Sequence, residues 1–311
     1  MWLIIFVVSL AILVKSSDSF IDAAQTLGSC LAFPPFIIGV LIVSLGTSLP
    51  ELIISIISIL NNSSEIVIGN VIGSNITNIF LILGVMAIVG KQLRMQYENI
   101  HLNFLIGATF LLLIIIWDRK IVLFEAVILL LMCILYLRST LILERRREQR
   151  AYEESQTERK TKKLNKKTII TLISTPILIY FGAQYTVTSI IELSRIFNIG
   201  TEVIAASAVA FGTSLPELAI TLSITKKGQL EIAVGNVLGS NVFNILLVIG
   251  VSGLIGRILI PQHMLVFDLP VLLIATLLFF FITRDRDISK WEGYMLVIFY
   301  VLFIGKILNL I

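Results

Sequence analysis

The chain has 311 residues, of which 57% are hydrophobic and 14% are charged, with a net charge of +4 and a mean hydropathy of +0.98. Soluble globular domains carry about 25% charged residues, so this composition excludes an ordinary soluble protein. Long apolar runs, many near the roughly 20 residues that cross a hydrocarbon core, predict an all-α integral membrane protein whose main partner is the lipid bilayer.

Hydrophobic runs and the breakers between them predict ten transmembrane helices. The expected spans are 2–26, 35–60, 66–90, 100–117, 121–143, 168–192, 200–225, 231–255, 266–283 and 291–310. The N-terminal run lacks the basic region and the small-residue cleavage site of a signal peptide, so we take it as the start of the first span.

The only long polar segment, 144–167, lies between the fifth and sixth spans and carries ten basic and five acidic residues. A basic segment between two spans is typical of a cytoplasmic loop, because Lys and Arg are retained on the inner side of the membrane. We therefore interpret it as a solvated cytoplasmic linker, not as a nucleic-acid patch. This places both termini outside the cell membrane and indicates no nucleic acid and no obligatory protein partner.

An internal repeat divides the chain into two similar halves. The motif Gly-Thr-Ser-Leu-Pro-Glu at 46–51 recurs at 212–217, an offset of 166 residues that continues without a gap. By direct count, 20 of the 41 positions from 44 to 84 are identical to their partners at 210 to 250. A duplication kept only for packing would not preserve polar residues while neighbouring apolar ones change.

Each repeat contains five expected spans, an odd number, so the second copy enters the membrane from the opposite side. The sequence thus predicts two inverted five-helix repeats, residues 1–143 and 168–311, joined by the linker 144–167. In such proteins a site between the repeats can face either side of the membrane in turn.

Glu51 and Glu217 lie in the middle of apolar spans. An ionised carboxylate there costs about 2.5 to 3.5 kcal/mol on insertion scales. Because the spans 35–60 and 200–225 contain no Lys or Arg, a bound cation or a proton is the expected partner of each glutamate.

Pro50 and Pro216 each precede one of these glutamates. Proline removes a backbone hydrogen bond and clashes with the carbonyl four residues back, so both helices are expected to be broken at the membrane midplane. The freed carbonyls around Thr47 and Thr213 would then point at the bound ion. The alternative is an ordinary proline kink.

A second shared element is Gly-Ser-Asn-x-x-Asn, which puts Ser74 with Asn78, and Ser240 with Asn244, on one helical face. These residues could instead serve as hydrogen-bonding contacts between helices. Together the repeats offer carboxylate, amide, hydroxyl and carbonyl oxygens without thiolate or imidazole, a set that suits Ca²⁺ and not softer metals.

The doubled GTSLPE motif and the two Gly-Ser-Asn-x-x-Asn segments resemble the α-repeats of the sodium/calcium exchanger family, prokaryotic type, within the Ca²⁺/cation antiporter superfamily. The resemblance also covers the ten-span layout and the central loop. It implies a secondary active antiporter that exchanges Ca²⁺, its transported substrate, for a monovalent cation by alternating access.

The resemblance also implies a set of ion-binding residues. Glu51 and Glu217 would be the Ca²⁺ carboxylates, and Thr47 and Thr213 would contribute backbone carbonyls. The flanking cation sites would be lined by Ser48, Ser214, Ser74, Ser240, Asn78 and Asn244.

Two positions depart from the family pattern. Members that use Na⁺ often have Asp at the position of Asn244, and related archaeal exchangers have Ala at the position of Ser44. Without a third carboxylate, one Ca²⁺ or two protons balance the charge of the site equally well, because two buried carboxylates close together compete for cations and protons. We therefore favour H⁺ over Na⁺ as the counter-ion.

Other functions remain open on the sequence alone. A Na⁺/Ca²⁺ exchanger proper, a K⁺-coupled exchanger and an exchanger of Mg²⁺ or Mn²⁺ would use the same oxygens. A cation channel would need a continuous pore and no obligatory counter-ion. An intramembrane enzyme is disfavoured, because the sequence contains no H-E-x-x-H motif, no G-x-S-x-G motif and no catalytic Asp pair.

Overall fold

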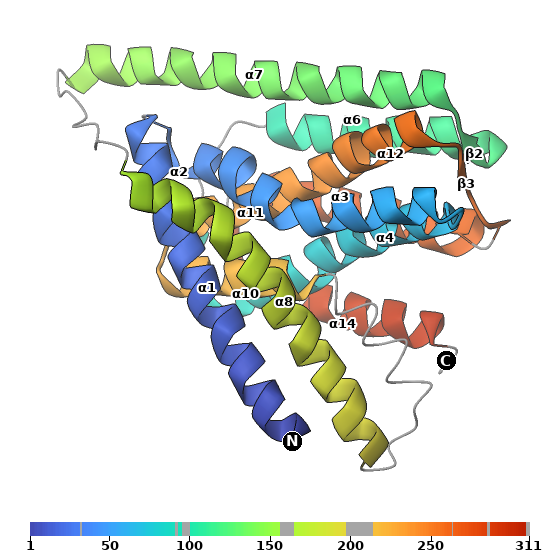
Figure 1. The fold of residues 1–311 in the computed structure, drawn as a ribbon. Coiled ribbons are helices and arrows are strands. Elements are labelled where there is room, and N and C mark those ends of the chain that lie inside the picture. Colours follow the sequence, from blue (N-terminus) through green and yellow to red (C-terminus); the bar gives the residue numbers. More distant parts are fainter. Residues whose placement is uncertain are drawn as a thin grey trace.

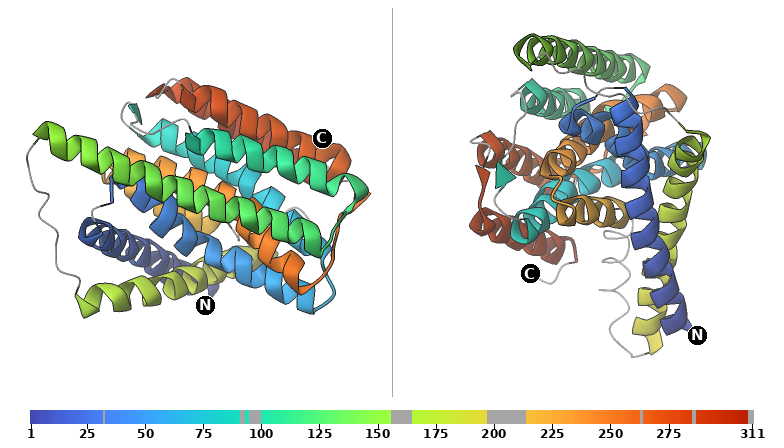
Figure 2. Two further views of the ribbon diagram at one scale, coloured as in Figure 1. Left: turned by 90° about the horizontal axis from the view of Figure 1, so that it is seen from above. Right: turned by 90° about the vertical axis from the view of Figure 1, so that its left-hand side faces the viewer.

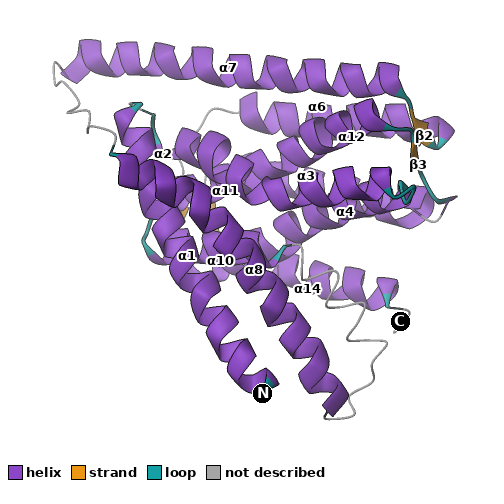
Figure 3. Ribbon diagram, viewed as in Figure 1, coloured by secondary structure: helices purple, strands orange, loops and turns teal. Residues whose placement is uncertain are grey.

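The computed structural model describes residues 1–31, 33–90, 93–94, 100–155, 165–196, 214–262, 264–284 and 287–308, and these are almost entirely helical (Figure 3). The helices of the first half are α1 (Trp2–Cys30), α2 (Pro35–Ile37), α3 (Ser44–Leu60), α4 (Glu65–Thr77), α5 (Gly84–Val89), α6 (Ile100–Ile115) and α7 (Leu123–Ser155). Those of the second half are α8 (Lys166–Ile196), α10 (Leu215–Lys226), α11 (Leu230–Phe243), α12 (Ile249–Ile255), α13 (Leu269–Arg284) and α14 (Lys290–Ile307).

Several helices continue through a wider, π-helical stretch, namely η1 (Ile38–Val43), η2 (Asn78–Leu83), η4 (Asn244–Val248) and η5 (Met264–Asp268). A 3₁₀ turn, η3 (Ile116–Asp118), ends α6. Thus α2, η1 and α3 form one continuous rod, as do α4, η2 and α5, and likewise α11, η4 and α12.

Eight helical segments within the described ranges are long and apolar enough to cross a membrane. They are Trp2–Cys30, Pro35–Leu60, Glu65–Val89, Ile100–Asp118, Leu123–Leu143, Lys166–Thr186, Leu230–Ile255 and Met264–Arg284. Each lies on an expected span, which confirms the all-α membrane class. α14 covers the last expected span, and α10 covers the second half of the span 200–225, whose first half lies outside the described residues.

The linker differs from the expected loop. α7 continues to Ser155, well past the expected end of its span at residue 143. The reason is local: the segment from 144 to 155 is rich in Glu, Arg, Gln and Ala, which have high helix propensity. Half of the polar linker is therefore a helical extension of α7.

The rods Glu65–Val89 and Leu230–Ile255 lie at the centre of the molecule. In the most apolar 18-residue stretch of each rod, 78% of the residues are buried, against 33% in Trp2–Cys30 and 22% in Lys166–Thr186. Figure 1 shows α4 and α11 in the middle of the bundle, with α7 along one edge and α14 near the opposite one. The two Gly-Ser-Asn-x-x-Asn segments are thereby kept away from lipid.

α1 and α8 form an antiparallel pair that crosses the other helices obliquely (Figures 1 and 2). A Cβ atom added at Gly182 of α8 would lie 3.0 Å from the backbone nitrogen of Leu13, so the two helices approach closely there. The Thr186 hydroxyl donates to the Ser9 hydroxyl at 2.9 Å within this contact.

The two halves repeat their local structure as well as their sequence. Asn78 and Asn244, at the repeat offset of 166, both begin a π-helical stretch. α5 packs against α14, and its counterpart α12 packs against α7. Two short antiparallel ribbons link the halves, one between β1 (Leu93–Arg94) and β4 (Asp287–Ile288), the other between β2 (Lys120–Ile121) and β3 (Ile258–Leu259).

The helix around Pro50 is not broken, contrary to the expectation from the sequence. α3 runs without interruption from Ser44 to Leu60 with Pro50 inside it, and the distortion occurs earlier, in the π-helical η1. In the second half, by contrast, α10 begins at Leu215, with Ser214 as its N-cap residue and Pro216 in its first turn, where the missing N–H needs no partner.

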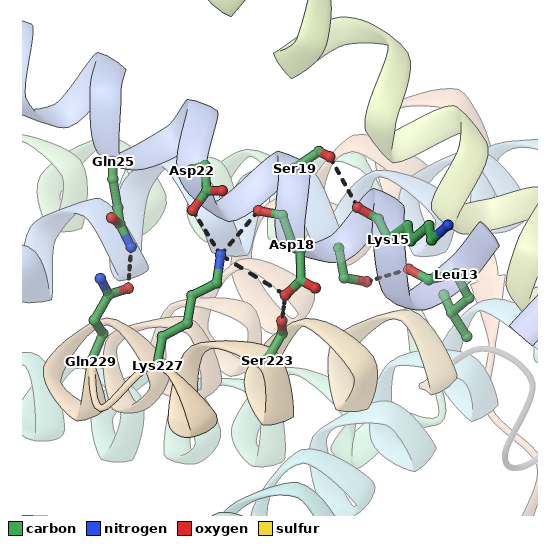
Figure 4. A network of polar contacts seen from close by, with 10 residues as sticks. Leu13, Lys15, Asp18, Ser19, Asp22, Gln25, Ser223, Lys227 and Gln229 are labelled. Carbon is green, nitrogen blue, oxygen red and sulfur yellow. Dashed lines mark hydrogen bonds and ion pairs between the residues drawn. The ribbon is translucent and has the colours of Figure 1, made fainter. Parts of the chain in front are cut away.

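A polar network fastens α1 to α10 and to the turn that follows it (Figure 4). The Lys227 ammonium lies 2.7 Å from an oxygen of Asp22 and 3.9 Å from an oxygen of Asp18. The Ser223 hydroxyl donates to the same Asp18 oxygen, and the amides of Gln25 and Gln229 bond to each other. The turn itself uses Gly228 in a left-handed conformation, φ +74°.

Candidate cation site

Four continuous helical segments carry the predicted ion-binding residues. α3 carries Thr47, Ser48 and Glu51, α10 and its N-cap carry Ser214 and Glu217, α4 and η2 carry Ser74 and Asn78, and α11 and η4 carry Ser240 and Asn244. All nine of these side chains are at most 4% exposed. Thr213, the tenth predicted residue, lies outside the described residues.

The packing brings these elements together across the two halves. α3 contacts α11 and η4 of the second half, and α10 contacts η2 of the first half. The carboxyl groups of Glu51 and Glu217 lie close enough to interact through their charges. The two halves therefore contribute one carboxylate each to a single buried site.

Neither glutamate has a basic partner in the part of the chain that the structure describes; the ion pairs found there involve Lys120 and Lys227. Both carboxylate oxygens of Glu51 and the Oε2 atom of Glu217 are buried, and within the described ranges no neutral or basic side chain donates to them; the side-chain group beside each carboxyl is the other glutamate. Burying a charge in this way is costly unless a cation or a proton compensates it.

Among the described residues, the helices that carry the carboxylates and the helices packed against them also hold unpaired neutral oxygens. Buried atoms without a hydrogen-bond partner occur at Ser48 Oγ, Ser74 Oγ, Asn78 Oδ1, Ser214 Oγ and Asn244 Oδ1. An unsatisfied buried polar group costs about 1 to 3 kcal/mol, and folded proteins contain few of them. Unpaired oxygens on helices that pack against one another fit a bound cation that takes the oxygen lone pairs.

Thr47 and Ser240 have protein partners instead. The Thr47 hydroxyl lies 3.2 Å from the Ser240 hydroxyl, and it donates to the Ser44 carbonyl at 3.1 Å and to Asn236 Oδ1 at 3.4 Å. Thr47 belongs to the first half, and Ser240 and Asn236 belong to the second. These bonds hold α3 against α11 directly beside the carboxylates.

Two asparagines that we did not predict as site residues also contact the site. Asn70 Nδ2 donates to the Glu51 carbonyl at 3.3 Å and to the Ser55 hydroxyl at 3.4 Å. Asn236 Nδ2 donates to the Thr221 hydroxyl at 3.0 Å. The pair Asn70 and Ser55 and the pair Asn236 and Thr221 occupy equivalent positions in the repeat. The identity of Asn70 and Asn236 at the offset of 166 is the sequence signal that could have revealed them.

Asn75 and Asn241 mark the point where the two halves meet. Asn75 Nδ2 donates to the backbone carbonyl of Asn241 at 3.1 Å, so two equivalent positions of the repeat are in direct contact. Asn241 Nδ2 instead bonds to Val237 of its own helix at 2.6 Å. The contact joins α4 of the first half directly to α11 of the second.

The donor chemistry is that of a site for a hard cation. The packed helices carry two carboxylates, amide oxygens and hydroxyls, and none of the predicted ligands is a cysteine or a histidine. Ca²⁺ takes six to eight oxygen ligands, and two carboxylates neutralise its charge. Thiolate and imidazole ligands, which softer metals prefer, are absent from this group of side chains.

Comparison with known proteins agrees with this geometry. The sequence profile of a family described as "Sodium/calcium exchanger protein" matches residues 1–141 and 167–308. The chain is 32% identical to the sodium/calcium exchanger MaX1 of Methanosarcina acetivorans, over 97% of each chain. It is 31% identical to the inner membrane protein YrbG of Escherichia coli, over 93% of this chain and 90% of that one.

Solved structures of the sodium-calcium exchanger NCX_Mj have the same fold. One of them superimposes with a TM-score of 0.82 at 26% identity and covers 98% of both chains. A family profile that matches nearly the whole chain, together with relatives of equal length, leads to one conclusion. The chain belongs to the sodium/calcium exchanger family.

Proposed function

We propose that this protein is a secondary active antiporter that carries Ca²⁺ across the cell membrane in exchange for a monovalent cation. The observation that supports it is the pair Glu51 and Glu217, buried without a basic partner in the described part of the chain, on helices packed against others of both halves that hold unpaired oxygens. Ca²⁺ would bind between the two carboxylates. The names of its relatives, which include a putative antiporter CaxA of Alkalimonas amylolytica, agree with this activity.

The repeat supports alternating access as the mode of transport. Ten spans in two inverted halves would give one site two equivalent routes, one to each side of the membrane. The linker 144–167 would be cytoplasmic and both termini external. Thr213 would add its carbonyl to the ligands, as Thr47 would in the first half.

The proposed counter-ion is the proton, because position 244 is an amide and the site holds two carboxylates. One Ca²⁺ or two protons balance that charge, whereas a further Na⁺ beside Ca²⁺ would require more negative charge. Sodium is the second candidate. The relatives MaX1 and NCX_Mj are named as sodium/calcium exchangers.

Uptake of radioactive Ca²⁺ into proteoliposomes tests the proposal. The purified protein is reconstituted, and uptake is followed under a Na⁺ gradient, under a pH gradient and with neither, the membrane potential being clamped. Uptake driven by either gradient and absent without one supports antiport. Uptake that follows the Ca²⁺ gradient alone would indicate a channel, and uptake driven by Na⁺ but not by the pH gradient would exclude the proton as counter-ion.

A further inference from the structure

Asn236 of α11 connects the two helices that carry the carboxylates. Its Oδ1 atom accepts from Thr47, which lies one helical turn before Glu51 on α3, and its Nδ2 donates to Thr221, one turn after Glu217 on α10. The side chain is 1% exposed, and all its bonds are to side chains. The Asn236 side chain therefore links α3, one turn from Glu51, to α10, one turn from Glu217.

The same amide contributes to the orientation of the Ser240 hydroxyl. Asn236 Oδ1 and the Ser44 carbonyl can only accept, so the Thr47 proton is directed to them. The Thr47 oxygen then accepts from Ser240, 3.2 Å away. With its proton used in this bond, Ser240 keeps its lone pairs free for a cation.

We propose that Asn236 is a positioning residue that sets the spacing between Glu51 and Glu217, and with it the preference of the site among divalent cations. The inference rests on the proposed Ca²⁺ antiport. The size of an oxygen-ligand cavity and its rigidity decide which cation fits. An amide held at both ends fixes the distance between α3 and α10, whereas two helices in apolar contact alone could shift with the size of the ion.

The test uses the bond to Thr221, which can be removed without touching any ion ligand. Thr221→Val removes the hydroxyl and Thr221→Ser restores it. Asn236→Leu removes the hydrogen bonds to both Thr47 and Thr221. Thr109→Val serves as the matched control, because it deletes a buried hydroxyl pair, Thr109 with Thr276 at 3.3 Å, between α6 and α13, which carry none of the candidate ligands.

The measurements are the apparent KM and maximal rate for Ca²⁺ uptake by proteoliposomes, and the inhibition of that uptake by Sr²⁺ and Mg²⁺. Thr221→Val should raise the KM for Ca²⁺ about 2- to 10-fold, the range for loss of one neutral hydrogen bond, and weaken discrimination against Sr²⁺. Asn236→Leu should have the larger effect. Thr221→Ser and Thr109→Val should keep the wild-type KM and ion preference.

A thermal melt without Ca²⁺ separates positioning from stability. If Thr221→Val lowered the melting temperature but left the KM and the ion preference at wild-type values, the bridge would be merely structural and the inference wrong. The inference would also be wrong if Thr221→Val and Thr221→Ser had the same KM and ion preference. Wild-type vesicles that carried no Ca²⁺ at all would overturn the proposed function itself, and the inference with it.

Discussion

Two residues, Glu51 and Glu217, define what the site can do, because they supply its only carboxylates within the described ranges. Replacing either by Gln should reduce Ca²⁺ uptake to the background of empty vesicles, since one remaining charge cannot neutralise Ca²⁺. The variants should stay folded, because removing a buried charge relieves a cost of insertion. Glu65→Gln, at an exposed position in the first turn of α4, is the control that should transport normally. A monodisperse Glu51→Gln or Glu217→Gln protein with wild-type uptake would show that the pair is not the site.

Asn244 is the residue that we expect to govern the counter-ion. Its Oδ1 atom is buried and unpaired at the start of η4. Asn244→Asp would add a third carboxylate, which strengthens the field for a further monovalent cation beside Ca²⁺. The variant should therefore gain Na⁺-driven Ca²⁺ uptake relative to pH-driven uptake. The check is the ratio of the two fluxes in matched vesicles; a lower rate at an unchanged ratio would reduce Asn244 to a packing role.

At the scale of elements, the close approach of α11 to η1 depends on glycines. A Cβ atom at Gly239 would lie 2.7 Å from the carbonyl oxygen of Val40, closer than real contacts allow. Gly239→Ala should therefore lower the thermal stability, although Ala is the better helix former by about 1 kcal/mol. Gly107→Ala is the control, since its Cβ would meet only Met132 at an ordinary 3.5 Å, and it should be neutral or stabilising. A Gly239→Ala protein as stable as the wild type would mean that the helices can separate at little cost.

Much of this arrangement could be predicted from the sequence, because membrane spans are long apolar runs and a repeat reveals itself by identity. The buried carboxylates and the unpaired oxygens of both Gly-Ser-Asn-x-x-Asn segments occur at the predicted positions. The uninterrupted α3 and the π-helical η1 before it were not predicted, because a proline inside an apolar span can either break or merely kink a helix, and a π-helical stretch has no residue signature. The repeat identity of Asn236 with Asn70 is visible in the sequence, but its hydrogen bond to Thr47 is not, because that contact joins residues 189 positions apart.

At the scale of the whole molecule, the proposed ten-span topology with a cytoplasmic basic linker makes a prediction about sidedness. Ser155, the last residue of α7, should be cytoplasmic, and Trp117, at the turn between α6 and α7, should be external. In a protein lacking Cys30 and Cys133, a membrane-impermeant thiol reagent applied to intact cells should label Trp117→Cys and not Ser155→Cys. Labelling of position 155 from outside would invert the proposed topology.

The network between α1 and the α10–α11 turn has no equivalent in the other half. Lys227, Asp18 and Asp22 correspond to Asn61, Gln184 and Thr188 at the repeat offset, and those three residues cannot form an ion pair. The two halves already differ at about half of the positions in their most similar stretch, and the charged network adds to this chemical difference between them. If the protein alternates between inward- and outward-facing conformations as proposed, the two should differ in energy, and salt, which screens exposed charges, should shift the balance between them.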